Sequence, residues 1–360
     1  MKKILLVFCL IFTLLLIKGQ PTHAEQLIRV SCKGCVLFDA QSERVLFEKN
    51  MHQQMRIASI TKIMTALIAV EEGVLDEYVV ISETATKQIG SSIYVKAGEE
   101  MKLIDLIYGL MLRSGNDAAY AIAEHVAGDF DTFVLWMNER AKQIGMYNTV
   151  FENPSGLDET STNLSTAYDM AKLMRVALQN PIFQAINNTS SHRATTKSGS
   201  VYVFHNKHRL VNHYDYITGG KTGYTKKAGR TLVTSARQNG MELIVVTLDD
   251  PNDWDDHLRL FEYGFNQFKN YHLLDDGILY VKELDRLFYL EDSLRVPLRE
   301  DEVKDCEFVI DRIHDQYYLR LVHQEKVLLS KELKDYNYHH DEPVEIWRDV
   351  VRRIKDGRLW

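Results

Sequence analysis

The sequence contains few residues that break secondary structure and few cysteines, with six prolines, nineteen glycines and four cysteines among 360 residues. Because 45% of the residues are hydrophobic and 26% are charged, collagen-like, low-complexity and disordered chains are excluded. Basic residues are not in excess, since 43 lysines and arginines stand against 50 aspartates and glutamates, for a net charge of -7. Nucleic acid is therefore not an expected partner. The length indicates two domains, or one large domain with an appendage.

The chain opens with a short cationic start followed by an apolar run. Lys2 and Lys3 precede the apolar residues 4–17, and the small residue Ala24 follows Thr22-His23. This order predicts a secretory signal peptide over residues 1–24, cleaved after Ala24. The alternative is an uncleaved membrane anchor, but about 14 apolar residues are fewer than the roughly 20 that span a bilayer. We therefore expect an exported protein.

Three cysteines remain after the signal peptide, an odd number for an exported protein. Cys32 and Cys35 have the spacing of a redox pair or of half a zinc site. However, the apolar residues 36–38 follow them, and no second pair has matching spacing. We expect either a structural bridge or free buried thiols for Cys32, Cys35 and Cys306.

Four histidines lie close together in the sequence, at His192, His205, His208 and His213. They form no His-Glu-x-x-His pattern and have no acidic ligand at helical spacing. The sequence therefore predicts loop or surface histidines here and no metal site.

The first half of the chain shows mainly helical periodicity. After a predicted strand, turn and strand over residues 36–49, apolar residues recur every three or four positions from Ile60 to Ile68, and Gly73 ends this helix. Ser59 is expected at its N-cap. Further helices are predicted over residues 103–111, 118–127, 132–144 and 165–178.

The periodicity then changes to that of strands. Residues 231–236 and 241–248 are rich in Val, Thr, Leu and Ile, and Asn239-Gly240 between them is a strong hairpin signal. Beyond a composition shift near residue 275, a small β-rich domain is predicted from short alternating runs at 279–284, 308–310, 317–322 and 327–329.

Three short motifs follow one another along the chain: Ser59-Ile60-Thr61-Lys62, Ser114-Gly115-Asn116 and Lys221-Thr222-Gly223. Each alone is a weak signal, since a Ser-x-x-Lys is expected by chance about once in a chain of this length. Each motif, however, stands in the context that its chemistry requires. The first lies at a helix start, the second in a tight turn between helices, and the third on a strand beside a hairpin. Together they predict a serine acyltransferase.

The first motif fits a nucleophile and its base. Residues i and i+3 of a helix share a face, so the Lys62 amine can reach the Ser59 hydroxyl. A lysine can accept that proton only if burial or neighbouring cations lower its pKa toward neutrality. The helix N-terminus would add backbone N–H groups near the developing oxyanion. Taken alone, Ser59 would be a plain N-cap and Lys62 a solvated lysine, and the other two motifs decide against that interpretation.

The second motif fits proton transfer and substrate binding. The Ser114 hydroxyl can relay a proton between Lys62 and the leaving amine, and the Asn116 amide can hold the peptide backbone of the substrate. Taken alone, both residues would be explained as turn and cap residues.

The third motif fits recognition of an extended, anionic peptide. Lys221 places a fixed positive charge, and Thr222 offers a hydroxyl to an anion. Gly223 lets a peptide approach the strand and pair with it as an added strand. The glycines at 219 and 220 indicate that backbone clearance matters on this strand.

With these motifs the sequence resembles the low-molecular-mass penicillin-binding proteins, which are serine-type D-alanyl-D-alanine carboxypeptidases (peptidase family S11). The resemblance covers residues 35–270 and is most extended at residues 57–65, 111–119, 153–158 and 219–225. The segment 250–257 is more similar to the sporulation-associated branch of Gram-positive spore formers than to the housekeeping branch.

The resemblance implies an α+β fold in which a helical subdomain packs on a five-stranded antiparallel sheet flanked by helices, followed by a small β-rich domain. It implies that Ser59 attacks the penultimate D-Ala carbonyl of a peptidoglycan stem pentapeptide, that the terminal D-Ala leaves, and that water hydrolyses the acyl-enzyme. Backbone N–H groups of Ser59 and Tyr224 would form the oxyanion hole. Covalent inhibition by β-lactam antibiotics is implied, and no metal or organic cofactor is.

One segment departs from the family pattern. Many relatives carry an arginine in the segment that corresponds to residues 249–256, where it helps to hold the terminal carboxylate of the substrate. In this chain the segment is acidic. No arginine role is therefore carried over, and Lys221 and Thr222 remain as the expected anion clamp.

Three other functions share part of this pattern. A class A β-lactamase has the same motifs, but the region after Asn153 offers Glu159 without a Glu-x-x-Leu-Asn arrangement, and Gly115 stands where that class usually has Asp. Endopeptidase or transpeptidase action differs only in the leaving group or the acceptor, and stays open. A non-catalytic penicillin sensor is the alternative from another class, and no cytosolic signalling segment supports it.

These expectations divide the chain into a signal peptide (1–24), a DD-peptidase catalytic domain (25–275), a small β-rich domain (276–342) and an amphipathic helix (343–360). In the last segment Trp347, Val350, Val351 and Ile354 recur at helical spacing among basic residues. This pattern is typical of a helix that lies in a membrane interface. We therefore expect peripheral contact with the outer face of the cytoplasmic membrane, with packing on the β-rich domain as the alternative.

Overall fold

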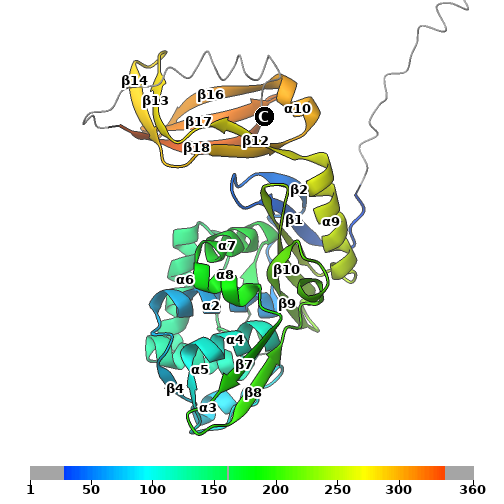
Figure 1. Cartoon of the computed structure of the whole chain (residues 1–360), viewed down its shortest axis with the longest axis vertical. Coiled ribbons are helices and arrows are strands. Elements are labelled where there is room, and N and C mark those ends of the chain that lie inside the picture. The colour runs from blue at the N-terminus through cyan, green and yellow to red at the C-terminus, as the bar shows by residue number, and fades with distance from the viewer. Residues whose placement is uncertain (1–27, 160–161, 337–360) are drawn as a thin grey trace, which may run out of the picture.

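The computed structural model describes residues 28–159 and 162–336, and Figure 1 shows its architecture. A helical subdomain lies beside a five-stranded sheet, and a second β-rich unit lies beyond one end of that sheet. The predicted signal peptide and the predicted amphipathic helix both fall outside the described residues. Within the described ranges, no helix is both long enough and apolar enough to cross a membrane.

The main sheet is antiparallel throughout, with the strand order β2-β1-β11-β10-β9. Its strands are β1 (Gly34–Asp39), β2 (Val45–Lys49), β9 (Ile217–Thr225), β10 (Gly229–Gln238) and β11 (Met241–Leu248). The predicted strand pair over residues 36–49 and the predicted hairpin are confirmed. Asn239 and Gly240 have φ of 53° and 73°, as a two-residue turn between strands of the right twist requires.

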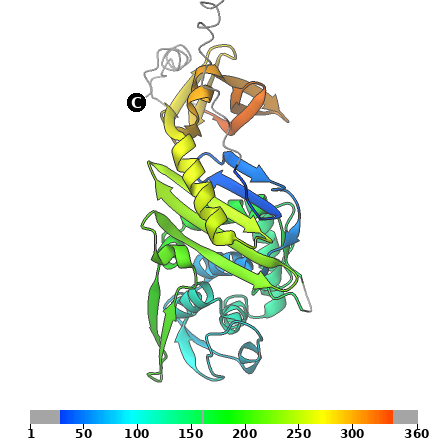
Figure 2. The same ribbon diagram turned by 90° about the vertical axis from the view of Figure 1, so that its right-hand side faces the viewer.

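Helices cover both faces of this sheet, which explains why its inner strands β1 and β11 are mostly apolar. Along β1, Val36 and Phe38 face the helical subdomain, whereas Leu37 packs in a separate core with residues of α9 (Asp253–Gln267). Figure 2 shows α9 lying across the sheet and leading into the C-terminal unit. The active-site strand β9 forms one edge of the sheet.

The helical subdomain contains η1 (Ala58–Thr61), α2 (Lys62–Glu72), α3 (Glu83–Thr86), α4 (Leu103–Arg113), α5 (Asn116–Ala127), α6 (Phe130–Ile144), α7 (Ala167–Gln179) and α8 (Pro181–Asn187). The five helices predicted from periodicity are confirmed as α2, α4, α5, α6 and α7. Helix α8 was not expected, because Asn180-Pro181 was interpreted only as a stop. Asn180 also starts a helix, since its Oδ1 accepts hydrogen bonds from the N–H groups of Ile182 and Phe183.

Short antiparallel strand pairs brace the loops between these helices. They are β3 (Met55–Arg56) with β6 (Leu164–Ser165), β4 (Tyr78–Val80) with β5 (Glu100–Lys102), and β7 (Ser191–Thr195) with β8 (Val201–His205). The short helix η2 (Arg209–Asn212) connects β8 to β9. These elements carry no periodic signal in the sequence, because each is at most five residues long.

The β-rich C-terminal unit is confirmed. It comprises β12 (Lys269–Leu274), β13 (Gly277–Val281), β14 (Arg286–Leu290), β15 (Leu294–Leu298), α10 (Glu300–Asp305), β16 (Cys306–Ile313), β17 (Gln316–His323) and β18 (Lys326–Asp335). Strand β12 pairs with β15, and its Leu273 and Leu274 belong to the core of this unit. The division of the chain at residue 275 remains a prediction, but the packing joins residues 269–274 to the C-terminal side.

A buried ion pair joins this unit to the main sheet. Arg44, between β1 and β2, contacts the Glu302 carboxylate at 2.5 Å, and the two side chains are 5% and 4% exposed. The same guanidinium donates to the Pro297 carbonyl and lies 5.3 Å from the ring centre of Phe268. Arg44 is therefore the central polar contact between the two parts.

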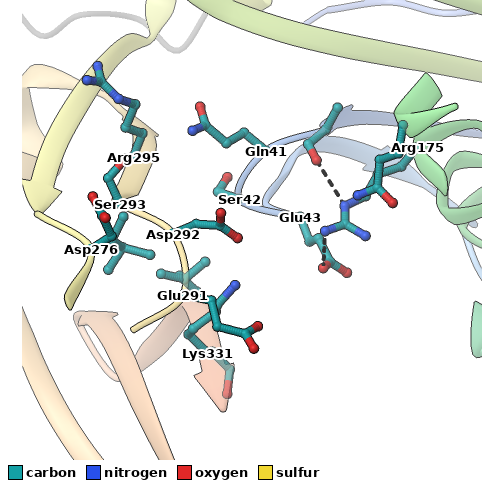
Figure 3. A pocket seen from close by; sticks show the side chains of 15 residues that line it. Gln41, Ser42, Glu43, Arg175, Asp276, Glu291, Asp292, Ser293, Arg295 and Lys331 are labelled. Carbon is teal, nitrogen blue, oxygen red and sulfur yellow. Dashed lines mark hydrogen bonds and ion pairs between the residues drawn. The ribbon is translucent and has the colours of Figure 1, made fainter. Parts of the chain in front are cut away.

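A polar cleft of about 500 Å³ lies beside this junction. Figure 3 shows that the β1–β2 turn and α7 form one wall, with charged residues of the C-terminal unit opposite. Arg175 of α7 is already engaged there, because it pairs with Glu43 at 2.9 Å and donates to the Ala40 carbonyl at 2.9 Å. None of the residues of the three sequence motifs lines this cleft.

The three cysteines of the described residues are free thiols, and Cys32 and Cys35 are buried side by side at the start of β1. A hydrogen bond with Cys32, together with burial, raises the pKa of the Cys35 thiol. Of the two expectations for this pair, the structure therefore has the free buried thiols. In the part of the chain that is described, no group of His, Cys, Asp and Glu is arranged to hold a metal ion.

The Arg44–Glu302 contact generates a stability prediction. Glu302→Gln should destabilise the protein by about 3 kcal/mol, because it leaves the buried Arg44 guanidinium without a counter-charge. Urea unfolding at neutral pH measures this loss. The matched control is Glu291→Gln, which removes a carboxylate from the exposed pair with Lys334 and should leave the unfolding midpoint unchanged. Equal midpoints for all three proteins would contradict the role of Arg44.

Candidate active site

The three motifs meet at the boundary between the helical subdomain and β9. Ser59 lies in η1, Lys62 is the first residue of α2, Ser114 follows α4, Asn116 is the first residue of α5, and Lys221 lies on β9. Hydrogen bonds among these side chains join Lys62 to Ser59 and to Asn116, and Lys221 to Ser114. Residues more than 150 positions apart in the sequence thus share one site.

Ser59 is not the N-cap of the α-helix, so that expectation was wrong. It lies inside the 3-10 turn η1, and Thr61 is the residue that precedes α2. Ala58 enters this turn with φ of 47°, a left-handed conformation that is uncommon for a residue with a side chain. Spacing of i and i+3 brings side chains together in a 3-10 turn as well as in an α-helix, so the Ser59–Lys62 contact survives the correction.

Three neighbours hold the turn in this conformation. The Thr231 hydroxyl of β10 donates to the Ile57 carbonyl at 2.9 Å. A side chain at Gly156 would place its Cβ 1.9 Å from the Ala58 carbonyl oxygen, and one at Gly223 would place it 2.9 Å from the Ser59 nitrogen. Both glycines therefore permit backbone to pack directly on the nucleophile turn. For Gly223 this is a second reason for glycine, besides the predicted approach of a substrate peptide.

Lys62 is fully buried and bound by three acceptors. Its Nζ lies 3.1 Å from Ser59 Oγ, 2.7 Å from Asn116 Oδ1 and 2.5 Å from the Ser155 carbonyl oxygen. Burial lowers the pKa of Lys62 well below the ordinary lysine value, and the positive charge of Lys221 lowers it further. An amine whose charged form is disfavoured in this way can accept a proton from the hydroxyl it touches.

Lys221 forms the second lysine–serine pair. Its Nζ donates to Ser114 Oγ at 3.1 Å and to the Thr222 carbonyl at 2.7 Å. Burial lowers the pKa of Lys221 to about 7, with a further contribution from the charge of Lys207. The expectation of a fixed positive charge therefore needs refinement, because near neutral pH this lysine also lies close to its titration point.

The turn between α4 and α5 aims Ser114 and Asn116 at the two lysines. Ser114 has φ of 63°, which reverses the chain directly after α4. Asn116 is fixed on its other side, because its Nδ2 donates to the Ile89 carbonyl at 2.6 Å and its backbone N–H donates to the Ser91 carbonyl at 2.7 Å. The Asn116 oxygen is thereby turned toward Lys62.

The remaining predicted residues continue along β9. Thr222 is paired with Leu232 and Tyr224 with Arg230 across β10. Because side chains alternate along a strand, the Thr222 and Tyr224 side chains lie on the face opposite to that of Lys221. The Tyr224 ring is exposed and points away from the buried lysines, so the backbone N–H of Tyr224 is the group left for the predicted oxyanion role.

The loop over residues 153–158 supplies site residues to which sequence reasoning gave no role. The Asn153 Oδ1 accepts hydrogen bonds from the N–H groups of Ser155 and Gly156, at 3.1 and 2.7 Å. This turn presents the Ser155 carbonyl to Lys62 and brings Gly156 against Ala58. The signal available in the sequence was Asn-Pro-Ser-Gly, a turn pattern that does not reveal which distant residue the turn contacts.

The predicted histidine group is only partly on the surface. His205 and His213 are exposed, as expected, and His208 lies in the loop between β8 and η2, as the loop alternative allowed, but it is buried. His192 is half-buried, where it stacks on Tyr108 with ring centres 3.7 Å apart and lies 2.6 Å from Asp105.

His208 belongs to a chain of buried polar side chains behind β9. Its Nε2 lies 2.9 Å from the Thr234 hydroxyl, which lies 2.8 Å from His257 Nδ1, and His257 Nε2 lies 3.1 Å from the Thr247 hydroxyl. A side chain at Gly220 would come within 2.7 Å of His208 Nε2. The glycine before Lys221 thus gives clearance to this imidazole, whereas the sequence suggested clearance for a substrate.

The acidic segment 249–256 has structural contacts that explain its composition. Asp250 and Asp256 accept hydrogen bonds from the Ser31 hydroxyl at 2.6 and 2.9 Å, which ties the N-terminal residues to the sheet. Asp253 pairs with Arg230 of β10 at 2.7 Å. These three carboxylates are therefore engaged in contacts within the fold.

Comparison with known proteins places these observations in a family. Residues 20–252 match the model of the D-alanyl-D-alanine carboxypeptidase family, peptidase S11. The chain is 33% identical over 249 residues to the D-alanyl-D-alanine carboxypeptidase DacF of Bacillus subtilis, a match that covers 67% of this chain and 64% of that protein's length. The family model alone covers more than half of the chain, and the protein therefore belongs to this family.

Two further proteins, an endopeptidase and a carboxypeptidase of known structure, are similar to this chain. A D-alanyl-D-alanine endopeptidase of Escherichia coli is 30% identical over 224 residues, which cover 61% of this chain and 72% of that protein. The crystal structure of a D-alanyl-D-alanine carboxypeptidase from Mycobacterium tuberculosis superimposes with a TM-score of 0.64 at 32% identity, over 68% of this chain and 95% of that one. The α+β penicillin-binding-protein fold implied by the motifs is thus confirmed.

The buried imidazoles generate a pH prediction. Burial lowers the pKa of His208 to about 3, whereas an exposed histidine has a pKa of 6.5. Between these two pKa values the unfolded chain binds a proton at His208 that the folded protein does not bind. The contribution of His208 to the free energy of unfolding is therefore complete above pH 6.5 and is lost as the pH falls toward 3. Between pH 6.5 and 5 this loss amounts to about 2 kcal/mol.

Urea unfolding at pH 7.5, 6 and 5 measures this dependence. His208→Gln should lose less stability on acidification than the wild type, because glutamine does not titrate. His213→Gln, at an exposed position, serves as the matched control and should keep the wild-type slope. The same slope in His208→Gln and in the wild type would contradict the prediction.

Proposed function

We propose that this protein is a serine D-alanyl-D-alanine carboxypeptidase that removes the terminal D-Ala from peptidoglycan stem pentapeptides. The observation that carries the proposal is the contact between the buried Lys62 amine and Ser59 Oγ, at 3.1 Å. A serine hydroxyl is a weak nucleophile until a base takes its proton. In this site the base is a lysine whose surroundings disfavour its charged form.

In the acylation step, Ser59 Oγ attacks the carbonyl carbon of the penultimate D-Ala while its proton passes to Lys62. The negative charge on the carbonyl oxygen is held by backbone N–H groups of Ser59 and Tyr224. Ser114 then relays the proton held by Lys62 to the leaving nitrogen, so that Lys62 is neutral again, free D-Ala departs and an ester on Ser59 remains. Lys221 supports this transfer through its contact with Ser114 Oγ.

In the deacylation step, water attacks the ester carbonyl after it loses a proton to Lys62, and the Ser59 hydroxyl is regenerated. Asn116 binds the substrate backbone, and Lys221 and Thr222 bind the terminal carboxylate. An extended stem peptide would add to the free edge of β9 as a further strand. β-Lactam antibiotics would acylate Ser59 in the same way. The alternative is endopeptidase or transpeptidase action on these peptides. Release of free D-Ala indicates a carboxypeptidase, whereas cleavage or formation of a peptide cross-link indicates one of the alternatives.

Replacing the nucleophile tests this function most simply. Ser59→Ala should abolish D-Ala release from a pentapeptide ending in D-Ala-D-Ala, and it should keep the fold because it removes one oxygen from a half-buried site. Intact-mass spectrometry with benzylpenicillin should show a covalent adduct on the wild type only. An adduct on the alanine variant at the wild-type rate would refute the assignment of Ser59.

We further propose that the protein is exported and acts at the outer face of the cytoplasmic membrane or in the cell-wall space. Family membership supports a cell-wall substrate, while the signal peptide (1–24) and the amphipathic helix (343–360) rest on the sequence pattern alone. A role in sporulation rests on the likeness of segment 250–257 and remains a prediction.

Vesicle flotation tests the proposed membrane contact. The chain from residue 25 to 360 should float with vesicles that contain anionic lipids, because basic side chains surround the apolar face of residues 344–360. The matched control is the same chain ended after Glu342, which should stay in the dense fraction. Equal flotation of both forms, or of neither, would refute the helix as an anchor.

A further inference from the structure

A third lysine, Lys207, lies at the active site outside the three motifs. It belongs to the segment between β8 and η2, whose neighbouring residues are firmly held. The Asn206 side chain accepts from the His208 backbone N–H at 2.9 Å and donates to the Thr189 carbonyl at 2.9 Å. The Lys207 backbone N–H donates to the Leu112 carbonyl at 3.0 Å, two residues before Ser114.

The Lys207 side chain reaches the loop that fixes Asn116. Its Nζ donates to the Ser91 hydroxyl at 3.2 Å, and the Ser91 carbonyl accepts from the Asn116 backbone N–H at 2.7 Å. Asn116 in turn accepts from Lys62. A continuous series of hydrogen-bonding residues therefore connects the exposed ammonium of Lys207 to the buried amine of Lys62.

The charge of Lys207 acts on both catalytic-site lysines. It is the second-largest cause, after burial, of the lowered pKa of Lys221. For Lys62 it follows burial and Lys221 as a cause that lowers the pKa. Unlike these two lysines, Lys207 is exposed to solvent, although partial burial of its amine lowers its pKa as well.

The charged groups around Lys62 come from three elements. Among the described residues that act on it, Lys221 of β9 and Lys207 are positive and Asp117 of α5 is negative. The Asp117 carboxylate is occupied by the backbone N–H groups of Ile93 and Tyr94. Arg113 at the end of α4 acts on Lys207 itself. The balance near Lys62 is therefore positive.

We propose that Lys207 is a positioning residue for acylation, which holds the Ser91 side of the Asn116 loop and places a positive charge beside the two buried lysines. The proposal rests on the proposed function, because it concerns the base of that reaction. Lys207 touches neither the nucleophile nor its base. It acts by holding the loop that fixes Asn116 and by the electrostatic effect of its charge at Lys62.

The rate of acylation by a chromogenic β-lactam, measured from pH 5 to 9, tests this role. The rate should rise with pH as the buried lysines lose their protons, Lys221 with a pKa of about 7 among them. This rise should move to higher pH in Lys207→Gln by about half a unit, because a positive neighbour of both lysines is lost. Lys207→Arg keeps the charge and should keep the wild-type profile. Raising the salt concentration to about 0.5 M should move the wild-type profile in the same direction, because it screens an exposed charge.

The matched control is Lys197→Gln, which removes the same charge at the turn of the β7–β8 hairpin, where Lys197 pairs with Glu100. It should keep the wild-type profile. An unshifted profile in Lys207→Gln, with wild-type acylation intact, would overturn the role of Lys207 and leave the proposed function standing. An equal shift in Lys207→Gln and Lys207→Arg would overturn the electrostatic role, because the arginine variant keeps the charge and changes only the contact. A wild type that forms no adduct on Ser59 would overturn both proposals.

Discussion

The burial of one amine, that of Lys62, is the constraint on which the rest of this structure depends. A charged ammonium that is removed from water loses far more hydration free energy than a few hydrogen bonds restore, so the neutral form is favoured. Lys62 has no carboxylate bonded to it; its partners are a hydroxyl, an amide oxygen and a backbone carbonyl. The positive charges of the surrounding lysines further favour the neutral form of Lys62. Lys62 can therefore act as the base that accepts the proton of the Ser59 hydroxyl.

The fold can be understood as the support for that contact. The left-handed Ala58 and the 3-10 turn bring Ser59 to Lys62, and glycine at 156 and 223 lets two backbones pack against the turn. The reversal at Ser114 directs the second motif to the same point, while β9 carries Lys221 along the sheet edge. Behind β9, His208 and His257 fill the sheet interior as neutral imidazoles.

The parts of this arrangement that follow from local patterns were predictable from the sequence. Apolar periodicity located α2 and α4 to α7, Asn239-Gly240 located the β10–β11 hairpin, and the order of the three motifs located the site residues. What remained hidden depends on tertiary contacts. Nothing local distinguishes a 3-10 turn at Ser59 from an N-cap, or a buried His208 from an exposed one. Likewise, Ser155 and Lys207 lie near the site only because distant segments pack together.

The protonation state of Lys62 tests the account most directly. Lysine labelled with 13C at Cε and 15N at Nζ allows each amine to be titrated by NMR, and Lys62→Met identifies the signal by its loss. The account predicts that Lys62 titrates well below 10.5, the value of an ordinary lysine. Titration of the Lys62 signal near that ordinary value in the folded enzyme would contradict the claim that burial makes this amine the base.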